Sequence, residues 1–268
     1  MLKDIFRSNT QLFPVGQFIA TSAILYMIYQ TIQGAVAWEW WLASYIMYFC
    51  TGCLGITITF HRYLTHRSFK YRFKWMEYLF SFFGAMGGTG SSIGWVAVHN
   101  EHHKHTDKEG DPHSPHLGFW NVMVPRYTFD MNKFAVRHLV TDKFHLILHN
   151  YYYLIMLAWV FALYLIGGFN LAIFVGVIPI GFQVWASVLS NFGNHTWGYR
   201  NFDTKEHSTN TWWLALLTFG EGWHNNHHAF PNSAKHGLQR NQIDLTWQHI
   251  RFLKAIGLAK KIRLPVAS

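Results

Sequence analysis

Two long stretches of the chain carry almost no charge, and this property constrains the fold more than any other. Residues 8–61 contain one charged residue, Glu39, and residues 144–199 contain no Asp, Glu, Lys or Arg. A membrane-spanning helix needs about 20 consecutive apolar residues, so each stretch is long enough for two. Such segments are rare in the cores of water-soluble proteins. We therefore expect an all-α membrane protein.

The expected spans form two hairpins. Trp38–Trp41 give the first stretch a polar, aromatic turn, and Gly167, Gly168 and Asn170 divide the second. Small residues typical of a cleavage site do not follow the first span, so we expect it to be retained and not to be a signal peptide. The four predicted spans are residues 15–35, 41–60, 148–167 and 170–190.

The basic residues predict the orientation. All 22 Lys and Arg lie before residue 8, between residues 62 and 143, or from residue 200 onward. By the positive-inside rule we expect both termini on the cytoplasmic side, with residues 61–147 and 191–268 forming a helical cap. Residues 1–268 then make one domain. The formal charge of +9 is explained by a membrane surface or an acidic partner, and we expect no nucleic acid.

Two features inside this plan are expected to be structural. Trp75–Val98 is apolar but interrupted by five glycines. Broken backbone is stable at membrane depth only where protein covers it, so we expect this segment at the interface or under the cap. Cys50 and Cys53 have C-x-x-C spacing inside the second span, and we expect them only to pack there.

Nine histidines cluster at the edges of the apolar stretches. Six of them occur in two H-x-x-H-H patterns, whose first histidine shares a helical face with the later pair. His61 and His66 are five residues apart, so we expect the end of the second span to loosen and let both turn inward. The nine are His61, His66, His99, His102, His103, His195, His224, His227 and His228.

This many imidazoles on one membrane face predicts two metal ions. Imidazole suits iron, copper, nickel and zinc, and a single zinc site needs only three or four ligands. A haem-binding electron carrier and a zinc intramembrane hydrolase are the alternatives, although the latter lacks an H-E-x-x-H motif. We expect ordinary hydrogen-bonded roles for six other histidines and leave His113 and His116 open as outer partners. The six are His105, His138, His145, His149, His207 and His249.

The segments HRYLTH, HNEHH and EGWHNNHH resemble the three histidine boxes of the integral-membrane fatty acid desaturases. GITITFHRYLTHRSF, DPHSPHLGFW and EGWHNNHHAFPNSAKHGL most resemble the Δ9 acyl-lipid and acyl-CoA branch, and the likeness runs from about Gly52 to the C-terminus. It implies four transmembrane helices under a cytoplasmic cap with a di-iron centre. It also implies insertion of a cis double bond into a saturated acyl chain with O2 and two electrons. A related hydroxylase or acetylenase stays possible.

The resemblance also implies a division of the ligands. One metal takes His61, His66, His99, His103 and His227, and the other takes His102, His195, His224 and His228, with Asn191 reaching the second metal through water. Zinc is expected to replace iron in overproduced protein. We expect nearby acids to orient the imidazoles: Asp107, Glu109, Asp111 and Glu221.

The acyl chain requires a tunnel to the metals. We expect aromatic residues to line it, with Tyr45 and Phe49 closing its far end from one face of the second span. The other candidates are Trp95, Trp185 and Trp197.

The expected partners follow from charge. Animal acyl-CoA enzymes of this family carry an Arg-Asp pair before the second box, where this chain has Ala97 and Val98. An uncharged mouth favours an acyl-lipid over an acyl-CoA, although Arg62, Lys104 or Arg200 could contact phosphate. The basic face predicts an acidic electron donor, such as a ferredoxin or cytochrome b5.

Overall fold

The computed structural model describes residues 12–124 and 135–265. Three helices within these ranges are long and apolar enough to cross a membrane: Phe13–Ile32, Glu39–Thr65 and Tyr152–Gly193. The first is α2, the second joins α3 (Glu39–Tyr48) to the π-helix η1 (Phe49–Thr65), and the third contains α9 (Tyr152–Leu171), η3 (Ala172–Val177) and α10 (Ile178–Gly193). The chain is thus mainly helical, as predicted.

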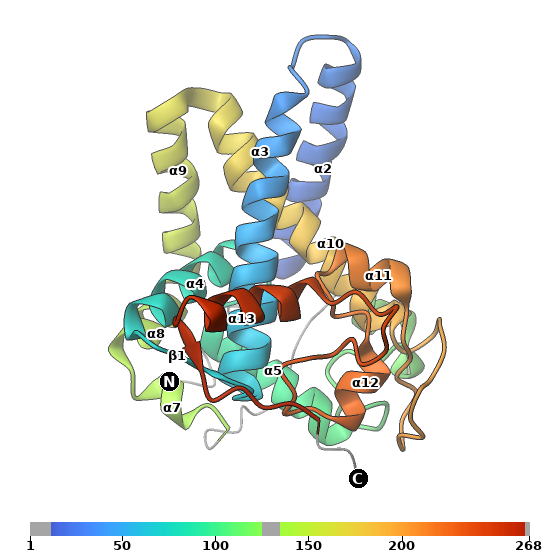
Figure 1. The fold of residues 1–268 in the computed structure, drawn as a ribbon. Helices are drawn as coiled ribbons and strands as arrows, with labels where there is room; N and C mark the ends of the chain where they lie inside the picture. Colours follow the sequence, from blue (N-terminus) through green and yellow to red (C-terminus); the bar gives the residue numbers. More distant parts are fainter. Residues whose placement is uncertain (1–11, 125–134, 266–268) are drawn as a thin grey trace.

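The third apolar helix contains a sharp turn. Gly167 has φ −142° and ψ 19°, and Gly168 has φ 70° and ψ −163°, so neither is helical. A positive φ is open to glycine at little steric cost. Figure 1 shows α9 rising to this turn and the chain descending again into α10. The turn lies where the sequence predicted a break between two spans.

The other helices gather at one end of the apolar helices (Figure 1). They are α4 (Lys74–Met86), α5 (Ser92–His105), η2 (Pro115–Leu117), α6 (Phe119–Met123), α7 (Arg137–Val140), α8 (Lys143–Asn150), α11 (Trp212–Leu217), α12 (His224–Ala229) and α13 (Leu245–Ala255). Lys70–Tyr71 (β1) and Ala259–Lys260 (β2) pair antiparallel with Lys70 opposite Lys260. This short pairing attaches the C-terminal segment beside the end of η1.

We call the helices at this end of the molecule the cap, and the segment Trp75–Val98 is part of it. It forms α4, a turn with positive φ at Gly88 and Gly90, and the first half of α5. Helix α4 packs along η1. The closest approach is between Gly55 and Gly84, where a Cβ on Gly55 would lie 2.3 Å from the Gly84 backbone nitrogen. Glycine at both positions therefore allows the two helices to touch through their backbones.

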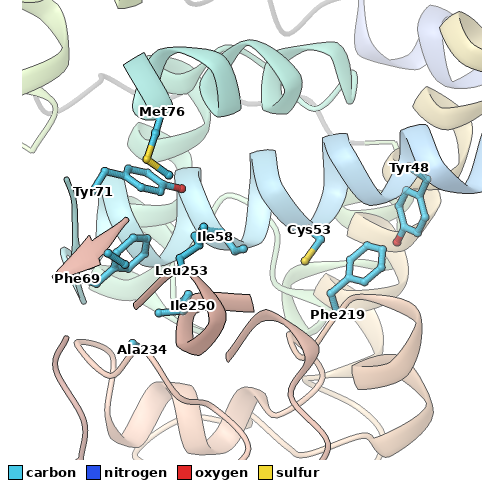
Figure 2. Packing of buried hydrophobic residues seen from close by; sticks show 11 residues of the cluster. Tyr48, Cys53, Ile58, Phe69, Tyr71, Met76, Phe219, Ala234, Ile250 and Leu253 are labelled. Atoms are coloured by element: carbon cyan, nitrogen blue, oxygen red, sulfur yellow. The ribbon is translucent and has the colours of Figure 1, made fainter. Parts of the chain in front are cut away.

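The lower half of η1 lies inside the cap. Ile58 of η1 packs in one buried cluster with Ile250 and Leu253 of α13, and Figure 2 shows these side chains facing one another. Cys53 belongs to the same cluster and is completely buried. The second apolar helix therefore delivers its end, and the histidines there, into the protein interior.

Candidate metal centre and its cavity

The nine clustered histidines come together from four parts of the chain in two groups. Within each group, every histidine offers a ring nitrogen and these nitrogens lie within 4.8 Å of one another. The larger group is His61, His66, His99, His103 and His227, and the smaller is His102, His195, His224 and His228. The two groups have the membership implied by the family resemblance.

The two H-x-x-H-H segments contribute to both groups because of helical spacing. On α5, His99 and His103 are four residues apart and join the larger group, whereas His102 joins the smaller. On α12, His224 and His228 join the smaller group and His227 the larger. Residues four apart lie one above the other on a helix, and the intervening neighbour points to the side.

His61 and His66 share a group because η1 is a π-helix. The backbone N–H of His66 donates to the carbonyl of His61 over 3.1 Å, a bond between residues five apart. In this winding, residues five apart lie on the same face. The expectation that the helix loosens at this point is wrong: the helix is wound more widely and stays regular to Thr65.

Carboxylates hold the outer nitrogens of three histidines. The Nδ1 atoms of His61, His102 and His195 lie 2.6, 3.0 and 2.9 Å from Glu221, Asp111 and Asp107. Such contacts fix the tautomer and direct Nε2 at the metal. Glu109, the fourth acid expected in this role, is exposed. Glu206, which the sequence analysis did not single out, lies 3.8 Å from Nδ1 of His228.

Burial favours the neutral form of several of these histidines. Burial lowers the pKa of His103 to about 3 and holds the pKa values of His99 and His224 well below their usual range. A neutral histidine whose Nδ1 donates has its lone pair on Nε2. Yet the Nε2 atoms of His61 and His227 are 3.1 Å apart, and those of His195 and His224 also 3.1 Å.

Two ring nitrogens at this distance either share a proton or hold a cation between them. The Nε2 atom of His102 is moreover buried without a hydrogen-bond partner. Nitrogen-only groups of five and four suit first-row divalent metals. The residues therefore fit two metal ions.

A cavity reaches the histidines from the side of the apolar helices. It is lined by Phe13 and Gln17 of α2, by Trp95 and Val98 of α5, and by His61, His99 and His224 of the metal groups. Trp95 also stacks on His99 with ring centroids 4.9 Å apart. Asn191, one turn before His195 on α10, lines the same cavity, and the structure does not test its contact with a metal.

Four expected tunnel residues do not line this cavity. Tyr45, Trp185 and Trp197 are largely exposed, and Phe49 packs against Phe219 and His249. The winding of η1 bears on Phe49, its first residue, because a face assigned at α-helical spacing is not the face that a π-helix presents. Tyr48, Gln183 and Phe219 line the cavity instead.

The remaining candidates fall into structural roles. His145 lies between Ser92 and Glu77, and Ser91 contacts His149. His113 stacks on His102 with ring centroids 4.3 Å apart, and His116 contacts the carbonyl of His195. Arg62 is completely buried and paired with Asp244 and Glu221, so it is not available to a phosphate. Ala97 is packed in the core and does not lie at a mouth.

One buried histidine beside the metal groups was not predicted from the sequence. His236 is 1% exposed, and its ring lies 4.5 Å from that of His227. It stands eight residues beyond the third box, in a loop with no repeating spacing. No sequence signal connected it to the centre.

A family model described as fatty acid desaturase matches residues 38–257. The chain belongs to the fatty acid desaturase family. The palmitoyl-monogalactosyldiacylglycerol delta-7 desaturase of Arabidopsis thaliana is 40% identical over 92% of this chain and 69% of its own length. The sn-1 stearoyl-lipid 9-desaturase of a Synechocystis strain is 38% identical over 92% of this chain and 79% of its own.

Another relative differs in the acyl carrier. The icosanoyl-CoA 5-desaturase of Limnanthes douglasii is 39% identical over 85% of this chain and 67% of its own length. The names of these three desaturases thus specify three double-bond positions and both lipid and CoA substrates. Family membership accounts for the histidine clusters, and the position and carrier need a separate argument.

Proposed function

We propose that this oxygen-dependent fatty acid desaturase inserts a cis Δ9 double bond into an acyl chain carried by a membrane lipid, at a di-iron centre. The observation that carries the proposal is the convergence of two groups of histidines at the inner end of a cavity that opens among apolar helices. The name of the Synechocystis relative, a stearoyl-lipid 9-desaturase, supports both the position and the carrier.

The reaction removes two hydrogens from adjacent methylenes. With O2, two electrons and two protons, the saturated chain becomes a cis alkene and two molecules of water form. Iron bound by the two histidine groups would supply the oxidising power that an unactivated methylene requires. The chain's own part is to bind the acyl tail, to exclude bulk water and to fix the imidazoles, which Glu221, Asp111 and Asp107 do from outside.

The acyl-lipid substrate is supported by the names of two relatives, a palmitoyl-monogalactosyldiacylglycerol desaturase and a stearoyl-lipid desaturase. Ala97 and Val98 do not bear on the carrier, because they are 2% and 9% exposed and lie in the core. A coenzyme A headgroup would need paired donors for its phosphates, which arginine supplies best. Arg62 is buried and paired with Asp244 and Glu221, so it does not supply them.

We further propose four membrane spans, with the cap and both termini on the cytoplasmic side. The turn at Gly167 and Gly168 divides the third apolar helix into two arms, and the distribution of Lys and Arg supports the orientation. An acidic electron donor, such as a ferredoxin or cytochrome b5, would then dock on the basic cytoplasmic face. Labelling of single cysteines from either side of sealed vesicles tests this topology.

Two experiments test the activity. Lipids of a host that expresses the protein should gain a Δ9 alkene, measured by gas chromatography with mass spectrometry. A hydroxylated or acetylenic product would show that the enzyme is the related hydroxylase or acetylenase instead. Zinc outcompetes ferrous iron at nitrogen sites, so zinc-filled protein should be inactive until iron is restored. Iron-loaded protein that consumes no oxygen in response to substrate would contradict the di-iron centre.

The carrier is tested with purified enzyme, iron and a reductant. We expect turnover of a stearoyl glycerolipid and much less of stearoyl-CoA. Efficient turnover of the thioester alone would overturn the acyl-lipid assignment.

A further inference from the structure

His236 is a fully buried histidine, and neither of its ring nitrogens has a hydrogen-bond partner among residues 12–124 and 135–265. Leaving a buried polar atom unpaired destabilises the fold, so such a residue needs a reason. Its backbone is held on both sides: the N–H donates to Asp244 over 2.7 Å, and the carbonyl accepts from Asn226 over 2.8 Å. The loop therefore places this imidazole at a defined point of the interior.

That point lies directly behind the larger histidine group. The ring of His236 lies 4.5 Å from the ring of His227 and 5.4 Å from that of His61. His227 turns its Nε2 inward, 3.1 Å from Nε2 of His61 and 2.9 Å from Nε2 of His103. The Nδ1 atom of His227 is consequently its outer nitrogen, and it too is buried without a partner.

A metal-bound histidine normally donates its outer N–H to an acceptor, which fixes the ring and raises its basicity. His61 has Glu221 for this purpose, at 2.6 Å. In the part of the chain that the structure describes, no carboxylate contacts the outer nitrogen of His227, but the ring of His236 lies 4.5 Å away. The Nδ1 atom of His236 in turn lies 3.6 Å from the same Oε2 atom of Glu221.

We propose that His236 is a positioning residue for His227. Glu221 accepts the Nδ1–H of His236, which leaves the lone pair of His236 on Nε2, and this lone pair accepts the outer N–H of His227. A shift of roughly half an ångström brings the 3.6 Å contact to hydrogen-bond length. One carboxylate would then orient two ligands of the larger group, His61 directly and His227 through His236. This inference rests on the proposed dimetal centre.

The test measures metal affinity without substrate. Apo-protein is loaded with Co²⁺ and dialysed against graded chelator, and cobalt per chain is determined together with its visible absorption. His236→Phe keeps an aromatic ring but cannot form the hydrogen bond, so the affinity for one of the two metals should fall by about 10- to 100-fold. His236→Gln can both accept and donate a hydrogen bond, so it should largely restore the affinity for that metal. His249→Phe, on α13 outside both groups, should match the wild type.

The affected metal can be identified with a second substitution. In a His195→Ala background, which disables the smaller group, His236→Phe should lower the affinity for the metal that remains. In a His66→Ala background, which disables the larger group, it should have no effect. Equal metal retention by His236→Phe and wild type would overturn the proposal, and so would a His236→Gln protein as weak as His236→Phe, since the ring would then serve packing alone. A wild type that holds two metals without desaturating would contradict the proposed function and leave this inference intact.

Discussion

Glu221 connects the metal centre to the rest of the cap through its two oxygens. Oε2 contacts Nδ1 of His61 at 2.6 Å, and Oε1 accepts from Arg62 over 3.3 Å. Arg62 binds both oxygens of Asp244, each at 3.0 Å, and is completely buried. Asp244 also caps α13 by accepting from the backbone of Trp247. The orientation of a metal ligand thus depends on a charged chain that ends at the C-terminal helix.

Glu221→Gln should reduce kcat/KM by about 10- to 100-fold, because a neutral amide orients His61 less strongly and raises its basicity less. Metal content should fall in the same variant. The control is Glu109→Gln, since Glu109 is exposed and the change should leave both quantities unaltered. Wild-type activity and metal content in Glu221→Gln would refute the orienting role.

Replacing any one of the nine grouped histidines with Ala should abolish activity while the protein still inserts into the membrane. Insertion depends on the apolar helices and not on the metals. Membrane fractionation and product analysis measure the two properties separately. His249→Ala is the control, because His249 belongs to neither group. Normal turnover in several of the nine variants would contradict the two-metal assignment.

At the scale of elements, the position of α5 matters most, because it carries three of the grouped histidines. Its start is held by His145 of α8, which lies 2.7 Å from Ser92 and 3.1 Å from Glu77 of α4. Glu77 also accepts from Lys74 and Tyr63, each over 2.6 Å. This buried carboxylate therefore joins α4, α5, α8 and η1.

The Glu77 carboxylate should make the fold sensitive to acid. Burial raises its pKa, but hydrogen bonds from His145, Lys74 and Tyr63 outweigh burial and leave the pKa below its usual value. The folded protein therefore binds fewer protons here than the unfolded chain, so this stability is present above the unfolded pKa of about 4.3 and is lost as the pH falls below it. Glu77→Gln should lower Tm at neutral pH, and its Tm should fall less steeply than that of the wild type as the pH drops below about 5. Thermal scans by tryptophan fluorescence measure both, and Asp203→Asn, at an exposed site, should change neither.

The contact between η1 and α4 should tolerate no side chain at Gly55. A Cβ there would meet the Gly84 backbone at 2.3 and 2.4 Å, and backbone cannot move aside as a flexible side chain can. Gly55→Ala should destabilise the protein by about 1–3 kcal/mol or more, as overpacking does, and lower Tm. Gly16→Ala is the matched control, since a Cβ at Gly16 meets nothing within 4 Å. Equal Tm values for the two variants would show that the helices can separate without cost.

At the scale of the whole molecule, apolar helices project from one end and the histidine-bearing helices gather at the other (Figure 1). The cavity connects the two parts, because its lining runs from α2 to the grouped histidines. An acyl tail can thus reach the metals from the apolar side. In the proposed orientation, an electron donor would approach from the other side.

Donor-dependent turnover should therefore weaken as salt increases. Attraction between an acidic donor and the basic face is screened over about 10 Å at 0.1 M ionic strength, so the KM for the donor should rise with salt. Turnover with an uncharged chemical reductant provides the control and should be nearly constant. If donor-dependent turnover does not change with ionic strength, the acidic-donor proposal is wrong and the basic face is better explained by contact with anionic lipid headgroups.

The sequence alone determined the properties that depend on near neighbours. Hydropathy predicted four spans, and the structure has three long apolar helices, the third of which turns at Gly167 and Gly168, where a break was expected. A helix satisfies its backbone within its own segment, so such segments can be recognised locally. The spacing of H-x-x-H-H predicted that the first histidine shares a face with the later pair and that this pair splays, and the structure divides each pair between the two groups. Three of the four acids expected to orient imidazoles do contact them.

Only the tertiary structure decided which distant side chains meet. His61 and His227 are 166 positions apart and have adjacent Nε2 atoms, and no local pattern predicts that distance. The wide winding of η1 is also a property of the folded chain, and it brings His61 and His66 to one face. Phe49, at the start of η1, packs against Phe219 and His249 and does not close the cavity. His236 owes its place to Asp244 and Asn226, which hold its loop from two other elements. Burial and long-range packing select these contacts, and both are properties of the folded chain as a whole.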